Sequence, residues 1–264
     1  MDTAVFISNL PSWLLFAVIV GVSLGANEAG FRLGRHLIRR GLREPEPPVA
    51  AVVGAILGLL AFLLAFTFAM TASRFDARRE LVIEDANRIR TAYQYSRLLP
   101  ERQRQALQKL FPEYVALRLG ITSLAVARQR EPRTNALQQL MWQQAASLVP
   151  ESMDSEMRSL FISSLSELVN VHTARKTVAL DYHIPGRIWL VLNLLSAMSM
   201  LSVGYQTGMF SPRRLVGMPV LAAAFALVIT MIAAMDATAQ HGFLISQQPL
   251  ADVLKLMRAS DKAP

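Results

Sequence analysis

Four long stretches of the chain contain no charged residue, and this feature constrains the fold more than any other. They cover residues 3–27, 49–73, 188–212 and 215–235. A helix needs about 20 apolar residues to cross the hydrocarbon core of a bilayer, so each stretch is long enough to span it. Only 17% of all residues are charged, against roughly 25% in ordinary soluble domains. The sequence therefore predicts an integral membrane protein with four transmembrane helices.

The segment between the second and third spans is polar and shows no alternation typical of strands. No glycine or proline occurs between Gly58 and Pro100, which predicts one helix of about 60 Å that continues span two beyond the membrane. Further helices are expected from Glu101 onwards with interruptions at Pro112 and Gly120, from Pro132 to Val149, and from Ser152 or Asp154 to about Tyr182.

These observations predict an all-α fold with a helical domain inserted between spans two and three. Residues 1–73 would hold the first two transmembrane helices, the first of them from about Pro11 to Ala26, and residues 74–186 the helical domain. Residues 187–236 would hold the last two spans. Residues 237–264 form a tail that includes an apolar, turn-forming segment at 242–250, and we expect it to dock on the helical domain.

Arginines in the short loops predict the orientation. The loop after span one carries Arg32, Arg35, Arg39, Arg40 and Arg43, and the loop after span three carries Arg213 and Arg214. Short Arg-rich loops stay in the cytoplasm. We therefore expect a multi-pass protein of the cell inner membrane, with the helical domain and both termini on the extracytoplasmic side.

Signatures of enzymes and of cofactor sites are scarce. The chain has no cysteine, so thiolate chemistry and Cys-based metal sites are excluded. Its four histidines form no metal-ligand motif, and the sequence contains no phosphate-binding glycine motif. The net charge of +8 is spread over helix flanks without interleaved aromatic residues, which argues against nucleic acid as a partner. We expect no enzyme activity, no cofactor and no bound metal.

An apolar stripe in span two is the first candidate functional feature. Phe62, Phe66 and Met70 recur at every fourth position, where they face lipid or another helix, or instead line a central axis as a hydrophobic constriction. The charged residues just beyond the span are Arg74, Asp76, Arg78, Arg79 and Glu80. They form either an ordinary charged helix surface or the vestibule of an ion pathway.

Two further patterns concern packing inside the membrane. Small residues recur every fourth position at Gly21, Gly25 and Ala29 in span one and at Gly54 and Gly58 in span two, a spacing that allows helix backbones to approach closely. In span three, polar side chains follow one another along the helix, among them Asn193, Ser196 and Ser199. They either bond to neighbouring helices or line a water path.

Several segments together resemble a bacterial bestrophin-like family of four-span membrane proteins. They are Phe66–Met70, Arg74–Arg79 with Asn87 and Ala92-Tyr93, Leu98–Pro100, His172–Arg175 and Ser246–Leu250. The family is distantly related to the bestrophins, which are pentameric anion channels with a hydrophobic neck on the second membrane helix. The resemblance implies that Phe62, Phe66 and Met70 form this neck.

Two features of the sequence depart from the bestrophin pattern. Bestrophins place the domain between spans two and three in the cytoplasm, whereas the arginines here predict the opposite side. The acidic calcium clasp of the animal channels has no counterpart after span four.

We therefore expect a homo-oligomer, a pentamer by analogy, that lies in the lipid bilayer and conducts small anions. The alternative is a non-conducting sensor or scaffold whose helical domain binds a partner.

Overall fold

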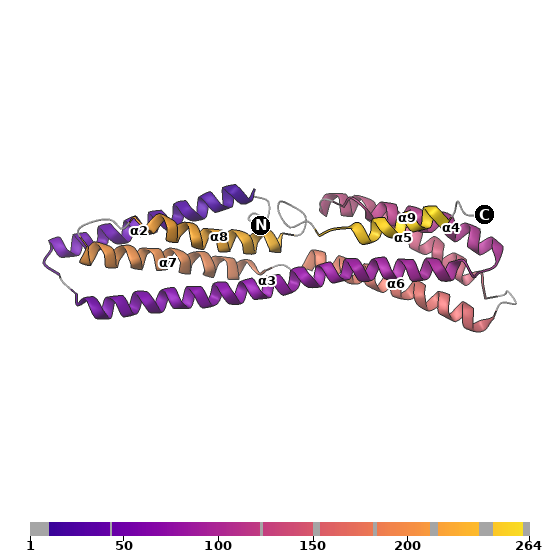
Figure 1. Cartoon of the computed structure of the whole chain (residues 1–264), viewed down its shortest axis with the longest axis horizontal. Coiled ribbons are helices and arrows are strands. Elements are labelled where there is room, and N and C mark those ends of the chain that lie inside the picture. Colours follow the sequence, from indigo (N-terminus) through magenta and orange to yellow (C-terminus); the bar gives the residue numbers. More distant parts are fainter. Residues whose placement is uncertain are drawn as a thin grey trace. The chain divides into compact units, whose positions relative to one another are not determined.

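The computed structural model describes residues 11–42, 44–121, 124–149, 154–181, 184–211, 216–237 and 245–260. In this part of the chain helices occur and strands do not, which confirms the all-α fold (Figure 1). The helices are α2 (Ser12–Arg39), α3 (Glu46–Ser96), α4 (Glu101–Arg118), α5 (Leu124–Ala146), α6 (Ser155–Asp181), α7 (Gly186–Phe210), α8 (Met218–Asp236) and α9 (Gln248–Ser260). By length and composition, α2, α3, α7 and α8 can each cross a membrane.

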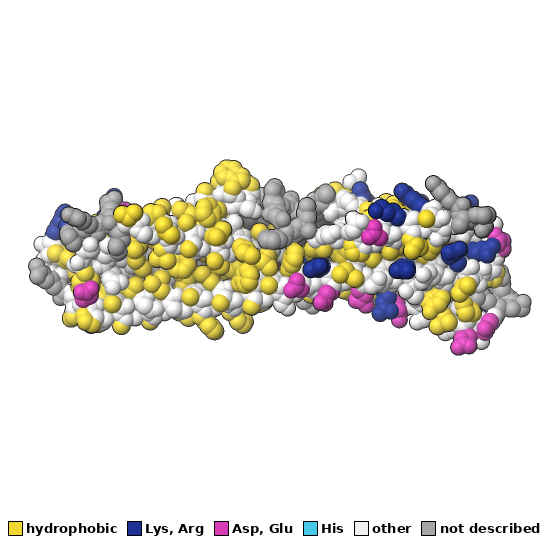
Figure 2. All heavy atoms as spheres, viewed as in Figure 1, with side chains coloured by type: hydrophobic (Ala, Val, Ile, Leu, Met, Phe, Trp, Pro, Cys, Tyr) yellow, Lys and Arg dark blue, Asp and Glu magenta, His cyan; other side chains and the backbone are white. Residues whose placement is uncertain are grey.

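The chain divides into two compact units, and the boundary on α3 lies between Arg74 and Phe75. We call α2, the first part of α3, α7 and α8 the membrane unit. The remainder of α3 together with α4, α5, α6 and α9 is the helical unit. Apolar side chains cover the membrane unit on the face shown in Figure 2, whereas charged side chains gather on the helical unit.

Some helix boundaries agree with the sequence prediction. α3 is a single helix of 51 residues that continues unbroken from Gly58 to Ser96, as the absence of glycine and proline between Gly58 and Pro100 predicts. The backbone N–H of Glu156 donates to the carboxylate of Asp154 at 3.0 Å, so Asp154 caps the start of α6 as expected.

Other boundaries differ from the prediction. α2 does not end near Ala26 but continues to Arg39, so Arg32, Arg35 and Arg39 lie on a helix and not in a loop. An ion pair one turn apart, from Arg32 Nε to Glu28 Oε1 at 2.8 Å, favours this continuation. Arg43, Ser152, Arg213, Arg214 and residues 242–244, on which other predictions rest, lie outside the described residues.

Two prolines lie inside helices instead of interrupting or starting them. Pro112 is in α4 and Pro132 in α5. α5 begins before Pro132 because Arg130 holds this first part of the helix against the end of α4. Its guanidinium donates to the carbonyl oxygens of Leu117 and Leu119 at 3.1 and 2.6 Å, which would otherwise lack partners at a helix C-terminus.

Glycines bring α2 and α7 into close contact in the membrane unit, but they are not the glycines singled out in the sequence. A Cβ on Gly30 would collide with the Leu201 carbonyl oxygen, and one on Gly204 with the backbone of Asn27. Gly34 and Gly208 continue this contact one turn further. By contrast, a Cβ at Gly21, Gly25, Gly54 or Gly58 would meet nothing within 4 Å in the part of the chain that the structure describes, so their small size serves no contact there.

The helical unit has its own apolar core. The ring of Tyr93 on α3 packs edge-on against Phe111 of α4, with centroids 5.8 Å apart, and both side chains are fully buried. Helix α9 closes the core with Leu250, Leu254 and Met257. Burying a large apolar side chain stabilises a fold by roughly 1.5–3 kcal/mol, so the C-terminal helix is an integral part of this unit.

Candidate functional site

α3 buries one narrow line of side chains along most of its length. From Leu60 to Thr71 and from Arg78 to Ser96, a line of buried positions recurs at steps of three or four residues, with Ala86 and Tyr93 buried beside it. This is the spacing by which a helix presents a single seam to its neighbours. The seam begins with apolar residues and threonines in the membrane unit and continues with charged and apolar residues in the helical unit. Its members are Leu60, Leu64, Thr67, Thr71, Arg78, Val82, Asp85, Ile89, Ala92 and Ser96.

Phe62 and Phe66 lie on the side of α3 opposite the seam. Their side chains are 66% and 61% exposed in the protomer, although both are large and apolar. Met70 is half-buried and packs against the core of the membrane unit. Successive steps of four residues turn a side chain by about 40° around the helix, so the stripe of Phe62, Phe66 and Met70 winds from the exposed face toward the seam.

The charged residues beyond the span divide between the two faces of α3. Arg78 is buried in the seam, with 7% of its surface exposed. Arg74 is half-buried, and its Nη1 is enclosed with no hydrogen-bond partner among the described residues. Asp76, Arg79 and Glu80 are exposed. The region therefore presents two acids and one arginine outward and turns two arginines toward its own chain.

Two of the polar residues predicted in α7, Asn193 and Ser199, bond within their own helix, whereas the buried hydroxyl of Ser196 has no hydrogen-bond partner among the described residues. Asn193 Nδ2 donates to the Trp189 carbonyl at 2.8 Å, and Ser199 Oγ donates to the Leu195 carbonyl at 2.7 Å. Ser196 and Ser199 are buried, and Asn193 is half-buried. Serine hydroxyls in helices commonly bond to the carbonyl four residues earlier, so Ser199 makes its bond without a second helix.

A buried carboxylate is the polar centre of the helical unit. Asp85, on the seam of α3, is 0% exposed. Its Oδ2 forms an ion pair with Arg118 Nη2 of α4 at 2.9 Å and accepts a hydrogen bond from Arg175 of α6. Both guanidinium groups are themselves largely buried. Because a buried charge is costly unless it is paired, these two cations depend on one carboxylate.

Tyr114 and Gln138 extend this polar centre. Arg118 Nη1 donates to the hydroxyl of Tyr114 at 2.5 Å, and Gln138 Nε2 of α5 donates to the same oxygen at 3.2 Å. Burial raises the pKa of Tyr114, so the phenol stays neutral at physiological pH. The side chains therefore join α3, α4, α5 and α6 in one network.

His172 of α6 lies beside this network with its ring edge toward Tyr114, at a centroid distance of 6.4 Å. Burial, and then the positive charges of Arg118, Arg175 and Lys176, lower the pKa of His172 to about 3. The imidazole is thus neutral at physiological pH. We call Asp85, Tyr114, Arg118, Gln138, His172 and Arg175 the Asp85 cluster.

The Asp85 cluster is not recognisable as a unit from the sequence. Asp85 stands among several charged residues of α3, and nothing in the local pattern marks it as the buried one. The available signal is its register, because Asp85 follows Thr71 and Arg78 at steps of seven residues along the seam. Among the described residues no three His, Cys, Asp or Glu side chains lie close enough to hold one metal ion.

Replacing Asp85 by asparagine should strongly destabilise the helical unit. Asp85→Asn keeps the size of the side chain but leaves two buried guanidinium groups without their counter-charge, a loss of about 3–5 kcal/mol for a broken buried pair. Chemical unfolding of the purified full-length protein measures the change. The matched control is Glu84→Gln, because Glu84 is exposed and contacts Arg88 at 3.4 Å; we expect it to cost less than about 1 kcal/mol. Equal effects of both variants would contradict the role of Asp85.

His172 should make the protein sensitive to mild acid. The folded protein does not protonate this imidazole until the pH is near 3, whereas the unfolded chain protonates it below about pH 6.5. Acid therefore favours the unfolded state. At pH 5 the protonation of His172 in the unfolded chain lowers the free energy of unfolding by about 2 kcal/mol. In unfolding curves at pH 7.5 and 5, His172→Asn should lose less stability than the wild type. The variant His36→Asn, in which an exposed side chain of α2 is replaced, should lose as much stability as the wild type. Identical losses of stability in all three proteins would refute the prediction.

Comparisons with known proteins agree with this architecture. The Bestrophin-like domain family matches residues 14–250, and a search of curated proteins returns no match. Two crystal structures of variants of a bacterial bestrophin homologue from Klebsiella pneumoniae are similar in fold, with TM-scores of 0.68 and 0.67 at 13% identity. They cover 96% and 95% of this chain and 99% and 98% of their own.

A third crystal structure, of a protein described only as a membrane protein, has a TM-score of 0.61 at 16% identity. It covers 94% of this chain and 96% of its own. At sequence identities this low, the similarity to solved structures establishes only the fold. The match to the family model covers most of the sequence and establishes the family. The chain is therefore a membrane protein that belongs to the bestrophin-like family.

Proposed function

We propose that the protein is an oligomeric ion channel of the bacterial inner membrane, favouring anions, in which α3 lines the pore. The exposed aromatic face of α3 carries this proposal. Phe62 and Phe66 are large, apolar and more than half exposed, and they lie opposite the seam that packs on the chain itself. Rings of such side chains around a central axis would form a hydrophobic constriction, with Met70 at its edge.

Small residues on the adjoining side of α3 support an oligomer. Gly54, Gly58, Ala61 and Ala65 are exposed and lie about 40–100° around the helix from Phe62. A helix that lines a ring-shaped pore turns one side to the axis and the next side to its neighbour. Small residues on that second side let helix backbones of two subunits approach closely.

The preference for anions rests on the family resemblance and on the arginines of α3. Arg74, Arg78 and Arg79 outnumber Asp76 and Glu80, and arginines near the mouth of a pore raise the local concentration of anions. Of these three arginines, Arg79 is the one whose side chain is exposed. The acids on the outer face oppose this effect, so ion selectivity is measured separately from conduction.

A liposome assay tests both conduction and the constriction. We expect halide flux into liposomes that contain the purified protein, and a severalfold faster flux for Phe66→Ala, because a smaller side chain widens the constriction and lets it hydrate. Leu190→Ala is the control, since Leu190 is equally exposed but lies on α7. In a salt gradient the reversal potential should lie near the equilibrium potential of the anion. Arg79→Glu should move it toward the equilibrium potential of the cation.

The outcomes separate the parts of the proposal. No flux from folded, oligomeric protein would favour the non-conducting sensor or scaffold. If neither Phe66→Ala nor Leu190→Ala changes the flux, α3 does not line the pore. A reversal potential near the equilibrium potential of the cation would contradict the preference for anions but not the proposal of a pore.

We further propose that the end of α2 lies in the cytoplasm and the helical unit on the extracytoplasmic side. Because the chain has no cysteine, a single introduced cysteine reports its own location. Cysteine at Gln139, an exposed residue of α5, should react with a membrane-impermeant maleimide in intact spheroplasts. Cysteine at Arg40, at the exposed end of α2, should react only after lysis, and the reverse pattern would overturn this orientation.

A further inference from the structure

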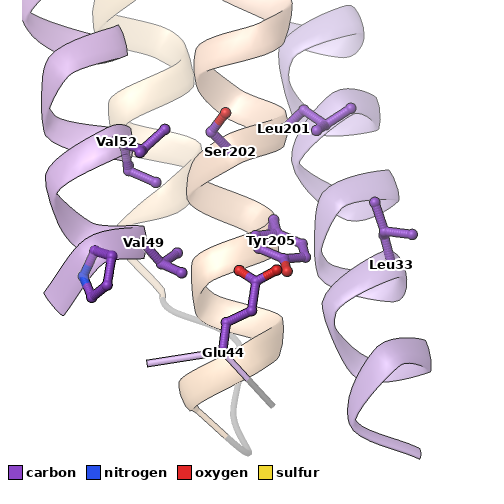
Figure 3. A pocket seen from close by; sticks show the side chains of 9 residues that line it. Leu33, Glu44, Val49, Val52, Leu201, Ser202 and Tyr205 are labelled. Atoms are coloured by element: carbon purple, nitrogen blue, oxygen red, sulfur yellow. The ribbon is translucent and has the colours of Figure 1, made fainter. Parts of the chain in front are cut away.

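The membrane unit contains an apolar groove with a polar end, formed by α2, the start of α3 and α7 (Figure 3). Its volume is about 400 Å³, within the roughly 300–1,000 Å³ typical of sites for small ligands. Leu33, Val49, Val52 and Leu201 form its walls, and Glu44 and Tyr205 lie together at one end. The groove is open to the surroundings of the protomer, since Leu33 and Val52 are 47% and 59% exposed.

The groove lies close to the ends of three membrane helices. Leu33 is in the last two turns of α2, Val49 and Val52 are in the first two turns of α3, and Tyr205 is in the last two turns of α7. In a bilayer this is the depth at which lipid headgroups meet their acyl chains. Tyrosine is enriched at this depth because it combines an apolar ring with a polar hydroxyl.

The charges at this end of the membrane unit fit a zwitterionic headgroup. The carboxylate of Glu44 forms a hydrogen bond with the hydroxyl of Tyr205, and both face the polar end of the groove in Figure 3. An exposed carboxylate beside an apolar wall favours a cation that can also donate hydrogen bonds. Arg40, at the end of α2, follows Leu33 by seven residues and so lies close to the same face of the helix; it supplies positive charge at the same end of the unit.

We propose that this groove binds a phospholipid with a primary-amine headgroup. One acyl chain would lie along the apolar walls, the ammonium group would donate to Glu44, and the phosphate would lie on the side of Arg40. An anionic lipid does not fit as well, because it would bring only negative charge to Glu44. A second copy of this chain that covered the groove with apolar side chains would bury Glu44 without a counter-charge, which is costly.

Native mass spectrometry of the full-length protein with added lipid tests this assignment. The probes are phosphatidylethanolamine, phosphatidylcholine and phosphatidylglycerol with identical acyl chains. Phosphatidylcholine has the same net charge as phosphatidylethanolamine but no N–H donor. We expect the wild type to bind phosphatidylethanolamine about fivefold or more tightly than either of the other two, as a charge-assisted hydrogen bond would allow.

Four variants place the site. Glu44→Gln should abolish the preference for the amine headgroup, whereas Glu46→Gln, on a second exposed carboxylate two residues further on, should keep it. Val52→Trp should fill the groove and remove the bound lipid. Val220→Trp is its control, because Val220 is 72% exposed near the start of α8 and does not line the groove.

Equal binding of the three lipids by the wild type, or a preference that survives Glu44→Gln, would overturn the proposal. Lipid binding that survives Val52→Trp would place the lipid elsewhere. If Val52→Trp instead lowers the mass of the oligomer while the number of bound lipids stays the same, the groove is covered by a second copy of the chain and the lipid assignment is wrong.

Discussion

The narrow seam of α3 is the constraint on which the rest of the structure depends. One helix of 51 residues supplies buried side chains to the cores of both units, mostly from one line of residues spaced by three or four within each unit. A helix that packs through so narrow a line leaves most of its membrane segment uncovered. Phe62, Phe66 and the small residues beside them are exposed for this reason.

The seam changes character along the helix. In the membrane unit it is apolar or carries threonines whose hydroxyls bond to their own helix, as Thr67 and Thr71 do. In the helical unit the same line carries Arg78 and Asp85. A buried carboxylate with two buried guanidinium partners permits few alternative packings, since every shift of α3 would separate opposite charges in a region of low dielectric. The Asp85 cluster thus fixes the register of α3 against α4 and α6.

Much of the fold could be predicted from the sequence because it follows from local composition. Uncharged stretches gave the four spans, and the absence of glycine and proline gave the long α3. The end of α2 and the start of α5 were predicted wrongly, because contacts between helices support them: Gly30 and Gly34 pack α2 against α7, and Arg130 bonds to α4. The glycines that join α2 to α7 were also missed, since spacing alone does not distinguish Gly30 from Gly25.

For the candidate site, the sequence by itself determined which residue types are present and how they are spaced along α3 and α7. Only the tertiary structure decided which of them face the chain and which face away. Arg78 and Arg79 are neighbours in sequence, yet one is buried and the other exposed, because adjacent residues of a helix point about 100° apart. The groove beside Glu44 and Tyr205 likewise exists only in three dimensions, since α7, which is distant in sequence, forms it together with α2 and α3.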